Sequence, residues 1–220
     1  MTRMDRYQNR QIRNIKKDLH QMKMQEEVKY KDLFLNVQSA TPGGSIQLLN
    51  GTATGTDQTT RLGSQIKCTS LRFKVGLTSL STLTSAAIFR IIVVWDTQTN
   101  GIQFTLAGNA LTGNVALLDN RVITDLIYSP RQLENADRFA IVYDKIHVLN
   151  AGANNTGATT PFPVEKVINK TFKFNRITQY DAITDVIGAI NRNSLHFIGL
   201  AQNSGESNYD IATRLYFKDI

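Results

Sequence analysis

The sequence predicts an all-β domain, a sandwich or barrel of eight strands, preceded by a basic arm that is expected to be helical. From residue 28 onward, short apolar runs and period-two alternation replace the helical spacing of the first 27 residues. Long connections rich in Gly, Thr and Asn separate these runs, as is typical of sandwiches and barrels. Residues 1–17 hold six Arg and Lys side chains against one Asp, so they carry +5 of the net charge of +7. The other 203 residues together carry only +2. We divide the chain into an arm, 1–27, and a body, 28–220.

The spacing of the basic residues in the arm indicates one face of a helix. Cations at positions 3, 6, 10, 13 and 17 are three or four residues apart, and no Pro or Gly occurs before Pro42. A solvated helix or a disordered tag is the alternative. The single sign of the charge and its terminal position favour an arm that binds nucleic acid or an anionic surface and orders on binding. The candidate contacts are Arg3, Arg6, Arg10, Arg13, Lys16 and Lys17.

The body shows two kinds of strand pattern. Leu71 and Phe73 alternate with Arg72 and Lys74, which predicts one buried and one exposed face. The run 86–95 is apolar at successive positions, so it is expected to be buried on both faces. The expected strands lie near 28–38, 45–50, 65–80, 86–95, 138–149, 164–174, 194–202 and 209–218.

Several irregular features are also expected. In RFAIVYDKIHVLN the apolar parity changes after Tyr143, which predicts a β-bulge at Asp144-Lys145. Short helices are considered at 119–135 and 178–190. Loops as long as those between the strands usually carry function or contact a neighbour. The long connections are 51–60, 97–118 and 150–163.

The segment FRIIVVWDTQTNG, residues 89–101, superficially resembles a calcium loop. Its third position is Gln98, and its twelfth is Ala107 where a bidentate Glu is required. Asn100-Gly101 readily adopts positive φ and reverses the chain. We therefore interpret the segment as a buried strand followed by a turn.

No catalytic site is predicted, and we expect the protein not to be an enzyme. The three histidines, His20, His147 and His196, are scattered, and neither strand histidine belongs to the paired His-x-His of a metal-binding cupin. Phosphate-binding, dinucleotide-binding and nucleophile-elbow motifs are absent. Asp137, Asp144 and Asp181 are left open as candidates for a carboxylate pair, which only the fold can reveal.

Cysteine content and hydropathy exclude other classes. The single Cys68 excludes an internal disulfide framework and is expected to be a buried core residue. No apolar run approaches the ~18 residues that span a bilayer, and the basic start lacks the apolar stretch of a signal peptide. We expect a soluble protein without an export signal.

Four stretches carry a family resemblance. The basic arm leads into KYKDLFLNVQ, and GTDQTTRLGSQIKCTSLRFKV contains an Arg61-Leu62-Gly63 turn before a long strand. FRIIVVWDTQTNG ends a strand in Asp and an Asn-Gly turn, and SPRQLENADRFAIVYDKIHVL places a Pro-led connection before an Arg-Phe strand. In order and spacing they resemble the single jelly-roll capsid proteins of satellite tobacco necrosis virus and of small circular single-stranded DNA viruses.

This resemblance implies an eight-stranded jelly roll that assembles with itself into an icosahedral shell, most simply of sixty copies (T=1). It places the protein in the virion, and in the host cytoplasm or nucleus during assembly. It also implies inward-pointing arms that neutralise a single-stranded genome, whether RNA or DNA; the host receptor is unknown. No cofactor is expected, although some related coats bind calcium between subunits, for which Asp57, Asp119 and Asp125 lie in candidate loops.

Two alternatives remain on the same fold class. One is a non-viral jelly-roll binding module, lectin-like or similar to a trimeric ligand, in which the basic helix is incidental. The other is an enzyme, which would require bound metal. The missing export signal argues against the first alternative, and the isolated histidines argue against the second.

Overall fold

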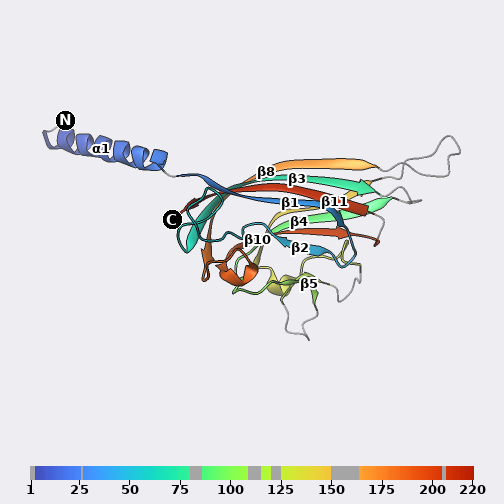
Figure 1. Ribbon diagram of the computed structural model, residues 1–220. Helices are drawn as coiled ribbons and strands as arrows, with labels where there is room; N and C mark the ends of the chain where they lie inside the picture. Colours follow the sequence, from blue (N-terminus) through green and yellow to red (C-terminus); the bar gives the residue numbers. More distant parts are fainter. Residues whose placement is uncertain are drawn as a thin grey trace.

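A computed structural model describes residues 3–25, 27–79, 86–108, 115–119, 125–149, 164–204 and 207–220. These residues form a two-layered β sandwich, and one long helix extends from it (Figure 1). The helix is α1 (Arg3–Gln25), and two 3₁₀ turns are η2 (Leu133–Asn135) and η3 (Ile187–Ala189). The strands are β1 (Lys29–Ser39), β2 (Ser45–Leu48), β3 (Gln65–Ser79), β4 (Ala87–Asp96), β5 (Thr105–Gly108), β6 (Ala116–Asp119), β7 (Phe139–Leu149), β8 (Glu165–Tyr180), β9 (Ile190–Arg192), β10 (Ser194–Ala201) and β11 (Ser207–Asp219).

The two large sheets are antiparallel, and each contains strands from distant parts of the chain. The five-stranded sheet has the order β1-β11-β3-β8-β9, and the four-stranded sheet has the order β2-β10-β4-β7. Within them β1 pairs with β11, β2 with β10, β3 with β8 and β4 with β7. In the sequence, the two strands of each pair lie between the two strands of the pair named before it.

The predicted all-β sandwich with a helical arm is therefore confirmed. Each of the eight expected strands has a counterpart in the structure: β1, β2, β3, β4, β7, β8, β10 and β11. The structure adds three short strands: β5 and β6 pair in parallel beside the four-stranded sheet, and β9 extends the five-stranded one. It also extends β8 to Tyr180, six residues beyond its expected end at 174.

The main core lies between the two sheets. Leu71, Phe73, Val75 and Leu77 of β3 are buried in it, while the intervening Arg72 and Lys74 are exposed. Cys68 lies in the same core, as predicted. Burial raises the pKa of its thiol to about 12, so the side chain acts as a small apolar residue.

A second core explains why the predicted strand 86–95 is apolar on both faces. Ile91 and Val93 of β4 face the main core, whereas Ile92 and Val94 face outward from the sandwich. Residues of the segment from 104 to 126, including Phe104, pack over this outer side. The outer face of the four-stranded sheet is therefore covered, and β4 lies between two apolar layers.

Two predictions about local structure were wrong in position or kind. The β-bulge in β7 lies at Val142, between Ile141 and Tyr143, and not at Asp144-Lys145, which pair regularly with β4. Ile146 and Val148 are exposed apolar residues, and these suggested the false change of parity.

The stretch 178–190 is not a helix but the end of β8, a bend, η3 and the start of β9. Tyr180 and Ile190 are buried cross-strand partners, whereas Ile183 between them is exposed, so the stretch has no continuous apolar helix face. In 119–135 the described residues form no α-helix, and their one helical element is the 3₁₀ turn η2; residues 120–124 lie outside the described part. The predicted loop 150–163 also lies outside the described part of the chain.

No helix in the described ranges has the length and apolar character needed to cross a bilayer.

Candidate nucleic-acid interface

The arm presents its described side chains to solvent. Side chains are described for residues 7–18 of α1, and all of them are exposed. This range contains four of the predicted contacts, Arg10, Arg13, Lys16 and Lys17. Arg3 and Arg6 belong to the helix, but their side chains lie outside the described part. Because a helix rises about 1.5 Å per residue, the cations at 10, 13 and 17 are distributed over about 10 Å of one face.

The root of the arm is fixed at the edge of the five-stranded sheet. Lys29, the first residue of β1, is 1% exposed, and its Nζ lies 3.0 Å from Asp219 Oδ2 at the end of β11. The same amino group donates a hydrogen bond to the carbonyl of Thr60. Asp219 in turn accepts a hydrogen bond from the backbone N–H of Leu62. The helix therefore leaves the sandwich at the end where the C-terminus lies (Figure 1).

The outer face of the five-stranded sheet carries an excess of positive charge. Its residues follow from strand alternation, since residues paired across antiparallel strands lie on the same side of the sheet. We call the outer side of β1, β11, β3 and β8 the bare face, because no described element packs over it. It presents six cations (Lys67, Arg72, Lys74, Lys173, Arg214 and Lys218) and three carboxylates (Asp32, Glu165 and Asp210).

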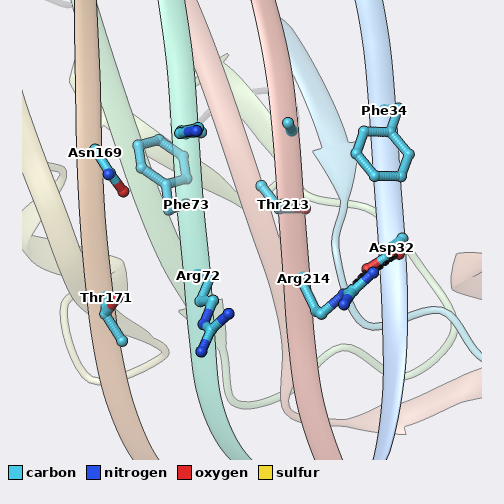
Figure 2. A pocket seen from close by; sticks show the side chains of 10 residues that line it. Asp32, Phe34, Arg72, Phe73, Asn169, Thr171, Thr213 and Arg214 are labelled. Carbon is cyan, nitrogen blue, oxygen red and sulfur yellow. Dashed lines mark hydrogen bonds and ion pairs between the residues drawn. The ribbon is translucent and has the colours of Figure 1, made fainter.

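A hollow of about 570 Å³ lies at the centre of the bare face (Figure 2). The strand register arranges its walls in two rows. The first row runs Asp32, Arg214, Arg72, Thr171 across β1, β11, β3 and β8, and the second runs Phe34, Ala212, Lys74, Asn169. We call these eight residues the hollow.

One cation of the hollow is neutralised internally. Arg214 donates from Nε and Nη2 to the two carboxylate oxygens of Asp32, at 2.7 and 2.6 Å. The guanidinium also lies 4.4 Å from the ring centroid of Tyr30. The hydrogen bonds to Asp32 raise the already high pKa of Arg214 further. This pair forms a wall of fixed geometry with little net charge.

The other two cations of the hollow keep their charge. Within the described residues, neither Arg72 nor Lys74 forms an ion pair. The Arg72 guanidinium lies 5.3 Å from the ring centroid of Tyr216, which orients it without neutralising it. Phe34 lies in the same row as Lys74, with Ala212 between them, and is 64% exposed. The hollow therefore combines uncompensated cations with an exposed aromatic ring.

The interpretation of residues 89–101 as a strand and a turn is confirmed. Asn100 and Gly101 have φ of 48° and 70°. Arg138 donates to both carboxylate oxygens of the fully buried Asp96, each at 2.7 Å. The backbone N–H of Gln98 donates to the same carboxylate at 3.1 Å. Protein donors therefore occupy the carboxylate that a calcium loop would offer to the ion.

The two histidines in strands, His147 and His196, pack against aromatic rings. His196 is fully buried, its Nε2 lies 2.7 Å from Ser194 Oγ, and its ring meets Phe104 edge-on. Burial lowers its pKa to about 3, so the imidazole is neutral at ordinary pH. His147 stacks on Tyr143, and burial lowers its pKa as well. The side chain of His20 lies outside the described part.

Two of the three carboxylates left open by the sequence, Asp144 and Asp181, have separate partners. Asp144 receives two hydrogen bonds from Arg90 at 2.8 Å, and Asp181 receives one from Asn191. Asp137 lies in the turn before β7. Among the calcium candidates, Asp57 precedes β3, Asp119 ends β6, and Asp125 accepts a hydrogen bond from the N–H of Ile127. Over the described ranges, no three His, Cys, Asp or Glu side chains are grouped to hold a metal.

Sequence reasoning found the arm but missed the hollow. The alternation in β3 had already indicated that Arg72 and Lys74 face away from the core. Phe34 and Asn169 lie far from them in sequence, and only the strand register brings them together.

Comparisons with known proteins give no family assignment. No protein-family model matches the chain, and no curated protein matches it. Among solved structures, the infectious bursal disease virus VP2 subviral particle aligns with 89% of this chain at 10% identity and a TM-score of 0.23. The chain spans about one third of that protein's length. At this TM-score the superposition is loose, and we infer neither fold nor function from it.

Proposed function

We propose that this chain is a viral capsid subunit: a jelly roll that assembles into a closed icosahedral shell and packages a single-stranded genome through its basic arm. The shell is most simply of sixty copies. The mature protein resides in the virion and passes through the host cytoplasm or nucleus during assembly. It acts as a structural protein without catalysis.

The nested strand pairing supports the jelly-roll assignment. A jelly roll results when eight strands fold as one long hairpin that is rolled into two sheets, so that the first strand pairs with the last. The four pairs β1·β11, β2·β10, β3·β8 and β4·β7 have this relation. The short strands β5, β6 and β9 are additions that leave the nesting intact.

The observation that carries the packaging proposal is the exposed basic arm at the root of this sandwich. Phosphate neutralisation requires cations and no base readout, so a helix with exposed Arg and Lys is sufficient. The cations Arg10, Arg13, Lys16 and Lys17 are exposed in α1, and residues 1–17 carry +5 of the net charge of +7. Lys29 fixes the point from which the arm leaves.

Exposed apolar residues in the loops support self-assembly. Leu133 is 84% exposed, Ile183 is 75% exposed and Ile102 is 70% exposed. They lie in the turn η2, in the bend after β8 and in the turn after β4, all outside the regular sheets. Contacts between subunits would remove such side chains from water, which favours association.

Negative-stain electron microscopy of the purified protein, with the 260/280 nm absorbance ratio of the same fraction, tests the proposal. We expect uniform round particles with a ratio typical of nucleoprotein. The full-length variant in which Arg3, Arg6, Arg10, Arg13, Lys16 and Lys17 are replaced by Gln, which we call the arm-neutral variant, should form particles with a protein-like ratio. A monomer or trimer at every salt concentration and pH would contradict the shell and favour a binding module. Particles of the arm-neutral variant that still hold a full complement of nucleic acid would contradict the role of the arm.

A further inference from the structure

We propose that the hollow on the bare face is a second nucleic-acid site, specific for single strands. In this site Arg72 and Lys74 bind neighbouring phosphates, and Phe34 stacks on a base. The site belongs to the folded body and is separate from the arm. Its ligand class is that of the proposed function, and its binding can be tested whether or not the chain forms a shell.

The two cations have the placement that a single strand requires. Arg72 and Lys74 are two residues apart on β3, so they point to the same side with about 6.8 Å between their Cα atoms. This separation is close to that of successive phosphates along an extended strand. Both side chains are exposed, and neither forms an ion pair within the described part of the chain. A phosphate can bind either of them without displacing a carboxylate.

Phe34 gives the site its preference for unpaired bases. Its ring is 64% exposed on the bare face, and its neighbour in the row is the small Ala212, which keeps the hollow open. Stacking of a base on an exposed aromatic ring contributes about 1–3 kcal/mol and does not depend on sequence. In a duplex the base faces are already stacked on one another, so only a single strand can use this ring.

The remaining walls of the hollow are polar and held in place. Asn169 and Thr171 are exposed on β8 and offer an amide and a hydroxyl to phosphate, sugar or base edges. On the opposite side the Arg214–Asp32 pair closes the hollow with a fixed, nearly neutral wall. Figure 2 shows these groups on adjacent strands around one depression. The anion is therefore directed to Arg72 and Lys74.

The position of the hollow links it to the arm. The arm runs directly into β1, and β1 carries Asp32 and Phe34. A nucleic acid held by the arm is thereby kept at high effective concentration over the bare face.

The test uses full-length arm-neutral protein in its unassembled state and measures fluorescence anisotropy of a labelled 20-nucleotide oligo(dT) over a range of salt. We expect salt-sensitive binding that persists without the arm cations. Adding Arg72→Gln with Lys74→Gln should lower the affinity about tenfold and reduce the slope of log affinity against log salt by about 1.4, that is, by two phosphate contacts on a single strand. Adding Phe34→Ala should lower the oligo(dT) affinity about tenfold and leave the affinity for a 20-base-pair duplex unchanged.

The matched control removes the same charge elsewhere on the body. Arg131 and Lys145 are exposed and lie away from the bare face, so Arg131→Gln with Lys145→Gln should leave the affinity nearly unchanged. The inference is overturned if the arm-neutral protein does not bind oligo(dT), or if this control weakens binding as much as the change at the hollow. It is also overturned if inorganic polyphosphate competes as well as oligo(dT), because stacking would then contribute nothing. These results would leave the shell and the arm unaffected, since electron microscopy and the absorbance ratio test those separately.

Discussion

The two large sheets of this protein have opposite outer faces. The four-stranded sheet is apolar on its outer side, and residues such as Phe104 and Leu117 cover Ile92 and Val94. The five-stranded sheet presents Arg72, Lys74 and the open hollow on its outer side, with no described element packed over them. One sandwich thus has one outer face that is packed in a core and one outer face that is open to solvent in the described part of the chain.

Because of this difference, side chains of the same type are buried on one sheet and exposed on the other. An aromatic ring at position 104 lies in a core, whereas one at position 34 lies in solvent. An Arg–Asp pair at 138 and 96 is largely buried, whereas the pair at 214 and 32 lies at the surface. Matched substitutions can therefore measure the contrast directly.

The largest expected effect comes from a matched pair of aromatic substitutions. Phe104→Ala should lower the free energy of unfolding by about 4 kcal/mol, because it leaves a cavity beside Phe139 and His196. Phe34→Ala should change it by less than about 0.5 kcal/mol, because the ring is mostly exposed. Urea unfolding of unassembled protein measures both. Equal losses would show that the bare face is also packed.

The two Arg–Asp pairs give the next contrast. Asp96→Ala should cost about 3 kcal/mol, because it leaves the Arg138 guanidinium partly buried without its carboxylate. Asp32→Ala should cost less than about 1 kcal/mol, since the pair with Arg214 lies at the surface and is partly exposed to solvent. The same urea unfolding experiment tests them.

A second substitution checks the cause. Adding Arg138→Met to Asp96→Ala should recover part of the loss, because it removes the unpaired charge. If the double variant is as unstable as Asp96→Ala alone, the carboxylate acts mainly through the turn that it holds at Gln98.

The covered sheet should also make the protein sensitive to acid. The pKa of His196 is lowered from 6.5 to about 3, so the unfolded chain binds a proton in a pH range where the folded chain does not. Stability should therefore fall as the pH drops below 6.5, by about 2 kcal/mol between pH 7 and pH 5. Urea unfolding at the two pH values should show a smaller difference in His196→Gln. An unchanged difference would assign the acid sensitivity to other groups, such as His147, whose pKa is also lowered.

Local patterns in the sequence were sufficient to predict most of the strands. The alternation around Leu71 and Phe73 located β3 and identified its buried side, and Asn100-Gly101 marked the turn after β4. These features depend on neighbours along the chain, which a sequence displays directly. The basic arm could be predicted for the same reason.

What could not be predicted depends on contacts between distant segments. The hollow requires Asp32 and Arg214 to meet across 182 positions, and no periodicity records that register. The cover over Ile92 and Val94 comes from short segments whose own patterns are weak. The predicted position of the β-bulge was wrong because Ile146 and Val148 are apolar but exposed, so the apolar pattern did not follow the buried side of the strand.

The smallest expected effect on stability concerns the cations of the hollow. Arg72→Gln with Lys74→Gln should change the free energy of unfolding by less than about 0.5 kcal/mol, because both side chains are exposed and neither forms an ion pair in the described ranges. The same double variant is expected to weaken oligo(dT) binding about tenfold. Urea unfolding and anisotropy on one preparation separate the two quantities. A loss of stability as large as that of Phe104→Ala would make Arg72 and Lys74 part of the framework, and the weaker binding would then reflect unfolding. Unchanged stability with weaker binding would mean that the sheet keeps these cations exposed for a ligand.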